Sequence, residues 1–167
     1  MFNAGPYDIV QSTPSMLQGN QPACIKHINL QEASGLLDVA YLSTAVPVEV
    51  GGEWPVHGVL YGPCKRPLVC LPTQLRKNSP CVNVFYMLDT GSHVCELGPT
   101  AFSALGAGAV PPRATLATIN GVHCHVNLCA HDGNHPDIPV LGADFLTMMS
   151  AVLTVDYKLS TVSLAHS

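Results

Sequence analysis

The apolar and polar residues of this chain mainly follow the short repeats that are typical of β-strands. Strands are predicted over residues 37–42, 46–50, 56–61, 67–71, 81–88, 115–119, 122–128, 151–155 and 159–164. Polar segments, many of them rich in glycine or proline, separate these runs. One of them contains Asn120-Gly121, the strongest hairpin signal in the chain, because both residues tolerate the positive φ of a two-residue turn. The pattern predicts a mostly β fold with strands paired as hairpins.

Helical spacing is confined to short segments. Leu141, Phe145, Met148 and Met149 recur at offsets that place them on one face of a helix. One short helix is therefore predicted after the Leu-Gly-Ala-Asp segment that begins at Leu141. Residues 101–105 are predicted to form a helical turn.

The chain divides into three parts by composition. Residues 1–35 are rich in Gln, Asn, Ser, Pro and Gly, which predicts a flexible leader or arm. Residues 36–65 are expected to hold N-terminal strands of uncertain role. Residues 66–167 are expected to form the main domain.

Composition supports the β prediction and excludes several functions. Of 167 residues, 47% are hydrophobic and only 11% are charged. Exposed helix faces need Glu, Lys and Arg, so the low charge disfavours a helical bundle. The net charge is −4 and no basic patch is visible, so no nucleic-acid partner is expected. No run of 18 clean apolar residues occurs, so no membrane association is expected.

Seven cysteines are present, an odd number, and none forms a Cys-x-x-Cys pair. A secreted disulfide framework usually has an even count in a shorter chain. Reduced thiols are therefore predicted, in an intracellular and cytoplasmic protein. The N-terminus also lacks the basic and apolar regions of a secretory signal.

The segment that carries most chemistry is Val84-Phe-Tyr-Met-Leu-Asp89-Thr90-Gly91-Ser92. An apolar strand leads a carboxylate, Asp89, into a tight turn. Thr90 adds a hydroxyl for hydrogen bonds across an interface, and Gly91 permits close approach of another backbone. Asp-Thr-Gly alone also occurs at ordinary turns, so the motif needs support from elsewhere in the chain.

That support comes from a second segment, Ile138-Pro-Val-Leu-Gly-Ala-Asp-Phe-Leu146. An apolar strand leading to Asp-Thr-Gly, followed later by an apolar-apolar-Gly segment that opens a short helix, resembles the retropepsin-like aspartic proteases. The second segment looks most like their retrotransposon-type members. Residues 66–71 also stand where this family has the strand before the catalytic hairpin. The resemblance covers residues 66–164 and implies a closed β-barrel.

The resemblance also implies a mechanism. One chain offers one Asp-Thr-Gly, and the class needs two carboxylates around one water, so a homodimer that pairs two copies of Asp89 is expected. The pair would share one proton and hydrolyse a peptide bond of a peptide or protein substrate, without metal or cofactor. Thr90, Gly91 and Ser92 would support the catalytic loop, and Leu141 and Gly142 would back it.

Four apolar residues near these motifs are expected in the core rather than in the site: Phe85, Met87, Val140 and Phe145.

Two departures from the family pattern stand out. His93 and Asp144 occupy positions near those where retroviral members have an acid and an arginine, so a reversed pair is one hypothesis and two unrelated polar residues is the other. Only 51 residues separate Asp89 from Leu141. Either residues 98–112 form an abbreviated flap, or residues 117–127 form the flap and a later hairpin is missing. Weak activity is expected, since a flap excludes water and clamps substrate.

Two other classes of function remain as alternatives. The first is a proteolytically inactive retropepsin-like dimer that serves as a structural or interaction module. The second is a metal site formed by His123, His125, Cys129 and His131, although strand alternation would put Cys124 on the face opposite the two strand histidines.

Two single residues also carry alternative interpretations. Cys95 follows the catalytic turn and is either a redox-sensitive thiol or a packed small side chain. Trp54 is either part of a surface loop or a dimer contact.

Overall fold

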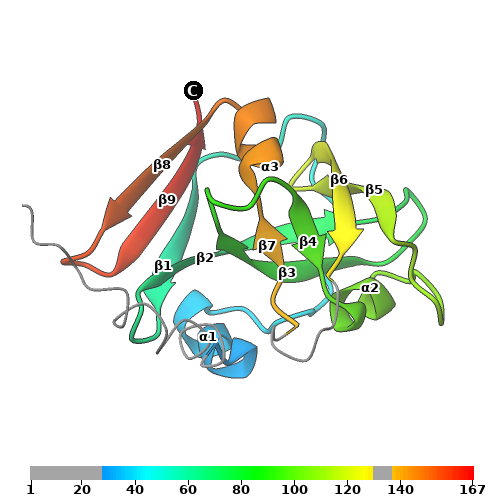
Figure 1. The fold of residues 1–167 in the computed structure, drawn as a ribbon, viewed down its shortest axis with the longest axis horizontal. Coiled ribbons are helices and arrows are strands. Elements are labelled where there is room, and N and C mark those ends of the chain that lie inside the picture. The colour runs from blue at the N-terminus through cyan, green and yellow to red at the C-terminus, as the bar shows by residue number, and fades with distance from the viewer. Residues whose placement is uncertain (1–27, 130–136) are drawn as a thin grey trace, which may run out of the picture.

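The computed structural model describes residues 28–129 and 137–167, which form nine strands in one sheet and three short helices (Figure 1). The strands are β1 (Val56–Tyr61), β2 (Arg66–Gln74), β3 (Cys81–Leu88), β4 (Cys95–Leu97), β5 (Ala114–Ile119), β6 (Val122–Leu128), β7 (Val140–Leu141), β8 (Ala151–Asp156) and β9 (Thr161–His166). The helices are α1 (Leu30–Leu37), α2 (Pro99–Ala104) and α3 (Ala143–Met148). The mostly β fold and the short helix near Leu141 are confirmed.

Six strands close into a ring. The long strand β2 pairs along one edge with β3 and along the other with β1 and β5. From β3 the ring continues through β7, β4, β6 and β5 back to β2. The closure is uneven, because β2 meets β5 over two residue pairs and β4 meets β7 over one. The predicted barrel is therefore present in an uneven form.

Strands β1, β9 and β8 extend outward from β2 as an arm of the same sheet (Figure 1). Strand β1 precedes residue 66, where the main domain was expected to start, and it pairs with both β2 and β9. Residues 56–61 thus belong to the same sheet as the strands that follow. The domain boundaries at 35 and 65 stay predictions.

Strand β3 is buried on both faces, which explains its continuous apolar sequence. Val84 and Tyr86 point into the main core, which fills the inside of the ring. Phe102 and Phe145 belong to the same core. Phe85 and Met87 point the opposite way, into a smaller cluster with Ala33 of α1 and Ile138. Of the four residues expected in the core, Phe85, Met87 and Phe145 are buried and Val140 is half-buried.

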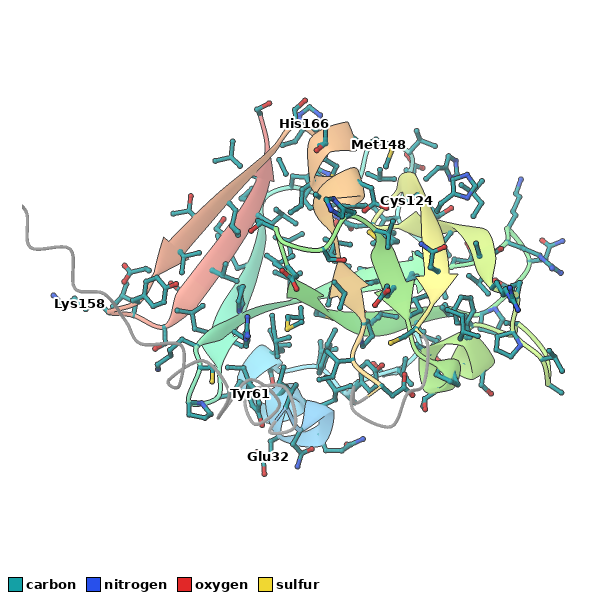
Figure 2. All side chains as sticks on the ribbon, in the orientation of Figure 1. Glu32, Tyr61, Cys124, Met148, Lys158 and His166 are labelled. Carbon is teal, nitrogen blue, oxygen red and sulfur yellow. The ribbon has the colours of Figure 1, made fainter. Side chains whose placement is uncertain are left out.

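Helix α1 ends where a strand over residues 37–42 was predicted, and that strand does not form. The helix begins inside residues 1–35, which were predicted to be a flexible leader or arm. Asn29 caps the helix by accepting hydrogen bonds from the backbone N–H groups of Gln31 and Glu32. The Tyr61 hydroxyl donates to Glu32 Oε2 at 2.7 Å, and Figure 2 shows both residues at this end of the molecule. The helix forms because its apolar side covers the second face of β3, a tertiary partner that local sequence does not reveal. Residues 1–27 of the expected leader lie outside the described residues.

The other predicted strands are confirmed with one exception. Residues 46–50 form no strand, and the only pairing nearby is an isolated bridge between Thr44 and Val82. Proline at 47 removes a donor that a sheet would need. Asn120 and Gly121 both have positive φ, as the hairpin prediction required. Of the four residues predicted to share one face of this helix, Leu141, Phe145 and Met149 are buried, whereas Met148 is exposed.

Two further observations bear on the sequence predictions. Cys64 is disulfide-bonded, so the prediction of reduced thiols is wrong for this residue. Across residues 28–129 and 137–167, no helix is long and apolar enough to span a membrane.

Candidate active site

The Asp89 turn begins where β3 ends beside β7. These two strands run parallel, with Leu88 opposite Leu141. The backbone N–H of Asp89 donates to the Leu141 carbonyl at 3.1 Å. The first residue of the turn is therefore fixed by the segment that the sequence predicted to back it.

Hydrogen bonds within the turn orient the carboxylate. The Gly91 N–H donates to Asp89 Oδ1 at 2.9 Å, and the Ser92 N–H donates to the Asp89 carbonyl at 3.1 Å. The Ser92 hydroxyl donates to the Val94 carbonyl at 2.8 Å. Asp89 is half-buried, whereas Thr90 and Gly91 are exposed. The turn thus presents one oriented carboxylate at the protein surface.

Gly142 packs directly against the far side of the turn. A Cβ atom at this position would overlap the Val94 carbonyl. The next residue, Ala143, donates its N–H to the Ser92 carbonyl at 2.8 Å. Leu141 is fully buried in the core. All six residues predicted for the site therefore lie together, in one backbone network that leaves no room for a side chain at 142.

Asp144 does not pair with His93, so that hypothesis is corrected. Its Oδ2 accepts the Cys95 N–H at 3.1 Å, and its Oδ1 accepts the Cys95 thiol at 3.0 Å and the Phe145 N–H at 2.7 Å. His93 is exposed. The two side chains do not meet because Asp144 lies in the first turn of α3, where its side chain points toward Cys95 of β4. The sequence analysis missed this contact, although an Asp in a first helical turn is a signal for backbone capping.

Cys95 is a packed side chain rather than a reactive thiol. A hydrogen bond with Cys124, burial, and a further hydrogen bond to Asp144 all raise the pKa of the Cys95 thiol far above its ordinary value. Burial in the core also limits the access of oxidants to this sulfur.

Replacing Asp144 by Asn is expected to lower the free energy of unfolding by about 1.5–3 kcal/mol, the usual range for hydrogen bonds to a charged group. The amide NH₂ would face either the Cys95 N–H or the Phe145 N–H, and neither can accept a hydrogen bond. Denaturant unfolding measures the change. Asp156→Asn is the control, because Asp156 is half-buried like Asp144 and accepts the backbone N–H groups of Lys158 and Leu159 through Oδ1 alone, an oxygen that Asn retains. Equal stability of both variants would contradict the assignment.

Within residues 28–129 and 137–167, His123 and His125 do not converge with a third side chain of a metal-ligating type. His123 and His125 are exposed, whereas Cys124 between them is buried. His123 Nδ1 lies 3.0 Å from the Thr118 hydroxyl. The predicted alternation is confirmed, and it separates Cys124 from both histidines. His131 lies outside the described residues.

Trp54 packs against Phe145 of α3, with ring centroids 6.5 Å apart. Its indole N–H donates to the Gly51 carbonyl at 2.8 Å. Trp54 is half-buried, and its ring supports the helix that follows the backing segment.

Neither of the two flap assignments matches a hairpin that is free to cover the Asp89 turn. Strand β5 pairs with β2, and β6 pairs with β4, so residues 114–128 belong to the ring and are not a flap. The segment from Gly98 to Arg113 contains α2 and a loop but no strand. Helix α2 follows the end of β4 that points away from the Asp89 turn (Figure 1). Within the described residues, no hairpin between β4 and β5 is available to close over Asp89.

A shallow apolar area adjoins the turn. Thr90 shares a hollow with residues of α3 and the start of β8, namely Ala143, Leu146, Thr147, Ser150 and Ala151. Met148 of α3 is exposed and is labelled in Figure 2, and Val152 of β8 is also exposed. The oriented carboxylate thus lies beside a surface that a second protein surface can cover.

Comparison with known proteins gives matches only at the level of structure. No protein-family model matches the chain, and none of the curated proteins matches it. A retropepsin-like aspartic protease from Rickettsia conorii is similar with a TM-score of 0.45 and 17% identity, over 68% of this chain and 90% of that one. The retroviral protease-like domain of Ddi1 from Leishmania major is similar with a TM-score of 0.33 and 14% identity, over 53% and 78% of the two chains. Both are of the protein class that the two motifs resemble.

Proposed function

We propose that this protein is an aspartic endopeptidase that acts as a homodimer. The observation that carries the proposal is the Asp89-Thr90-Gly91 turn, which follows a strand buried on both faces and offers an oriented carboxylate at the surface. A carboxylate held in this way is suited to acid–base chemistry on a bound peptide.

One chain supplies only half of the required chemistry. Two adjacent carboxylates share one proton, so that one acts as base and the other as acid. The sequence contains one Asp-Thr-Gly motif, at Asp89. The second carboxylate is therefore assigned to Asp89 of another copy, related by a twofold axis through the two turns.

The reaction follows from this pairing. The ionised carboxylate removes a proton from the water as its oxygen adds to the peptide carbonyl. The protonated carboxylate donates a hydrogen bond to the carbonyl oxygen. Proton transfer to the peptide nitrogen then breaks the C–N bond and releases two peptides.

The apolar area around the turn is proposed as the contact between copies. Thr90 lies at its edge, and α3 and β8 contribute Leu146, Thr147 and Ala151. Burial of these side chains would bring the two Asp89 turns together while removing apolar surface from water.

The alternative is an inactive dimer of the same fold. One observation favours it, the lack of a strand pair between β4 and β5 in the described residues. Cleavage of a peptide library at acidic and neutral pH distinguishes the two, because the inactive dimer would sediment as a dimer and cleave nothing.

Mixing subunits tests whether both carboxylates are needed. The wild-type chain and Asp89→Asn are refolded together in equal amounts, so that about one quarter of the dimers carry two intact Asp89 residues. We expect activity to fall to about one quarter of that of the same total amount of wild type. A fall to about one half would mean that each chain acts alone. Sedimentation of the mixture confirms that dimers form.

A further inference from the structure

A second group of side chains lies directly behind the Asp89 turn and takes no part in the proposed reaction. It consists of Cys95 at the start of β4, Cys124 on β6 (Figure 2) and Asp144 at the start of α3, here called the Cys-Cys-Asp cluster. One Sγ or carboxylate oxygen from each residue lies within 4.8 Å of the other two. Both cysteines are buried and Asp144 is half-buried. Three residues with donor atoms typical of metal ligands, distant in sequence, therefore converge.

The sheet opposes a disulfide between the two cysteines. Strands β4 and β6 run parallel with Cys95 opposite Val126, so Cys124 is two residues away along β6. A strand spacing of about 4.8 Å and a two-residue rise of about 6.6 Å place the Cα atoms about 8 Å apart. Disulfides usually need Cα atoms within about 7 Å. The sulfur atoms lie side by side, but a direct bond would require backbone movement.

The same spacing suits a metal ion between the sulfurs. Two thiolates on a tetrahedral Zn²⁺, each at about 2.3 Å, lie about 3.8 Å apart. The Cys124 and Cys95 Sγ atoms are 3.8 Å apart. Asp144 Oδ1 is 3.0 Å from Cys95 Sγ, so a small shift of the carboxylate would bring it to an adjacent corner of the tetrahedron.

The carboxylate is already oriented as metal-bound carboxylates usually are, by donors outside the ligand set. The backbone N–H groups of Cys95 and Phe145 donate to its two oxygens at 3.1 and 2.7 Å. The Gly142 N–H donates to Cys95 Sγ at 3.3 Å, which would stabilise a thiolate. These three donors come from β4, the backing segment and α3.

We propose that Cys95, Cys124 and Asp144 bind one Zn²⁺ ion, with water as the fourth ligand. Two thiolate ligands favour Zn²⁺ over Mg²⁺, Ca²⁺ and Mn²⁺, which prefer oxygen ligands. Binding releases the two thiol protons as the two Zn–S bonds form, with no change of oxidation state. The ion joins β4, β6 and α3 behind the Asp89 turn. This site goes beyond the proposed peptidase, whose reaction needs no metal.

The test uses the full chain, reduced with a phosphine and freed of metal. Zn²⁺ is titrated in, and bound metal is measured by mass spectrometry after removal of excess. One equivalent per chain is expected. Cys124→Ser and Asp144→Asn should each weaken binding by at least about 100-fold, since each removes a ligand. Cys81→Ser is the matched control, because Cys81 is also a buried strand cysteine. It should bind like wild type.

A spectroscopic measurement keeps the test valid if a variant fails to fold. Co²⁺ added to the wild-type chain should give tetrahedral visible bands and a sulfur-to-cobalt charge-transfer band. Absence of the charge-transfer band would overturn the proposal. Loss of zinc in His123→Ala/His125→Ala, with retention in Cys124→Ser, would also overturn it and assign the metal to the histidines. Asp89→Asn should bind one zinc whether or not the wild type cleaves peptides, so the two proposals fail separately.

Discussion

Replacement of Asp89 by Asn is expected to lower kcat/KM for peptide cleavage by about 10³-fold or more. General acid–base catalysis contributes about 10²–10⁴-fold, and this variant removes the base and the proton donor from both copies at once. The amide oxygen can still accept the Gly91 N–H that now bonds to Asp89 Oδ1. The fold and the dimer should therefore persist. Steady-state kinetics on a cleaved library peptide, with sedimentation in parallel, measures both.

Asp38→Asn is the matched control for this change. Asp38 ends α1 with a φ of 53°, a conformation that Asn tolerates well. The kcat/KM of the Asp38→Asn variant should equal that of the wild type. If Asp89→Asn cleaved as fast as the wild type, the observed activity would come from another group or from a contaminant, and the peptidase proposal would be wrong.

Gly142→Ala is expected to damage both stability and activity. The added Cβ would overlap the Val94 carbonyl, and Val94 follows the Asp89 turn closely in the chain. The atoms that the added Cβ would meet all belong to the Val94 backbone, so the strain cannot be relieved by a side-chain rotation. A loss of about 1–3 kcal/mol in the free energy of unfolding is expected, as for other overpacked sites. A displacement of the turn by about 1 Å would lower kcat by about 10²-fold.

Gly35→Ala provides the control for this glycine. Gly35 lies inside α1 and has open space where a Cβ would stand. Alanine there should stabilise the protein by about 0.5–1 kcal/mol and leave kcat unchanged. Denaturant unfolding and peptide kinetics distinguish the two variants. A Gly142→Ala protein with wild-type stability and rate would contradict the close packing behind the turn.

Local sequence was sufficient for the candidate site because its residues are adjacent along the chain. Asp89, Thr90 and Gly91 are consecutive, and the apolar strand before them identifies where the turn begins. The pairing with Leu141 needed a second motif, and the resemblance supplied it. The contact between Asp144 and Cys95 was not predicted, because the direction in which a helix leaves a strand depends on packing against β4.

The N-terminal part shows the opposite case. Residues 1–35 as a whole are rich in Gln, Asn, Ser, Pro and Gly, which predicts a leader that includes residues 30–35, and the pattern from residue 37 predicts a strand. Residues 30–37 form a helix because Phe85 and Met87 leave an apolar face on β3 that Ala33 and its neighbours cover. Short helices gain most of their stability from such packing, which no local pattern records.

The sequence by itself determined a mostly β chain, the places of its hairpins and the single carboxylate turn, because each depends on alternation or on turn residues within a few positions. The tertiary structure decided the uneven closure of the ring, the assignment of residues 114–128 to the ring rather than to a flap, and the convergence of Cys95, Cys124 and Asp144. These features depend on strand order and register. They join residues that are distant in the chain, such as Cys95 and Asp144, 49 positions apart, and distant residues meet only when the whole sheet has formed.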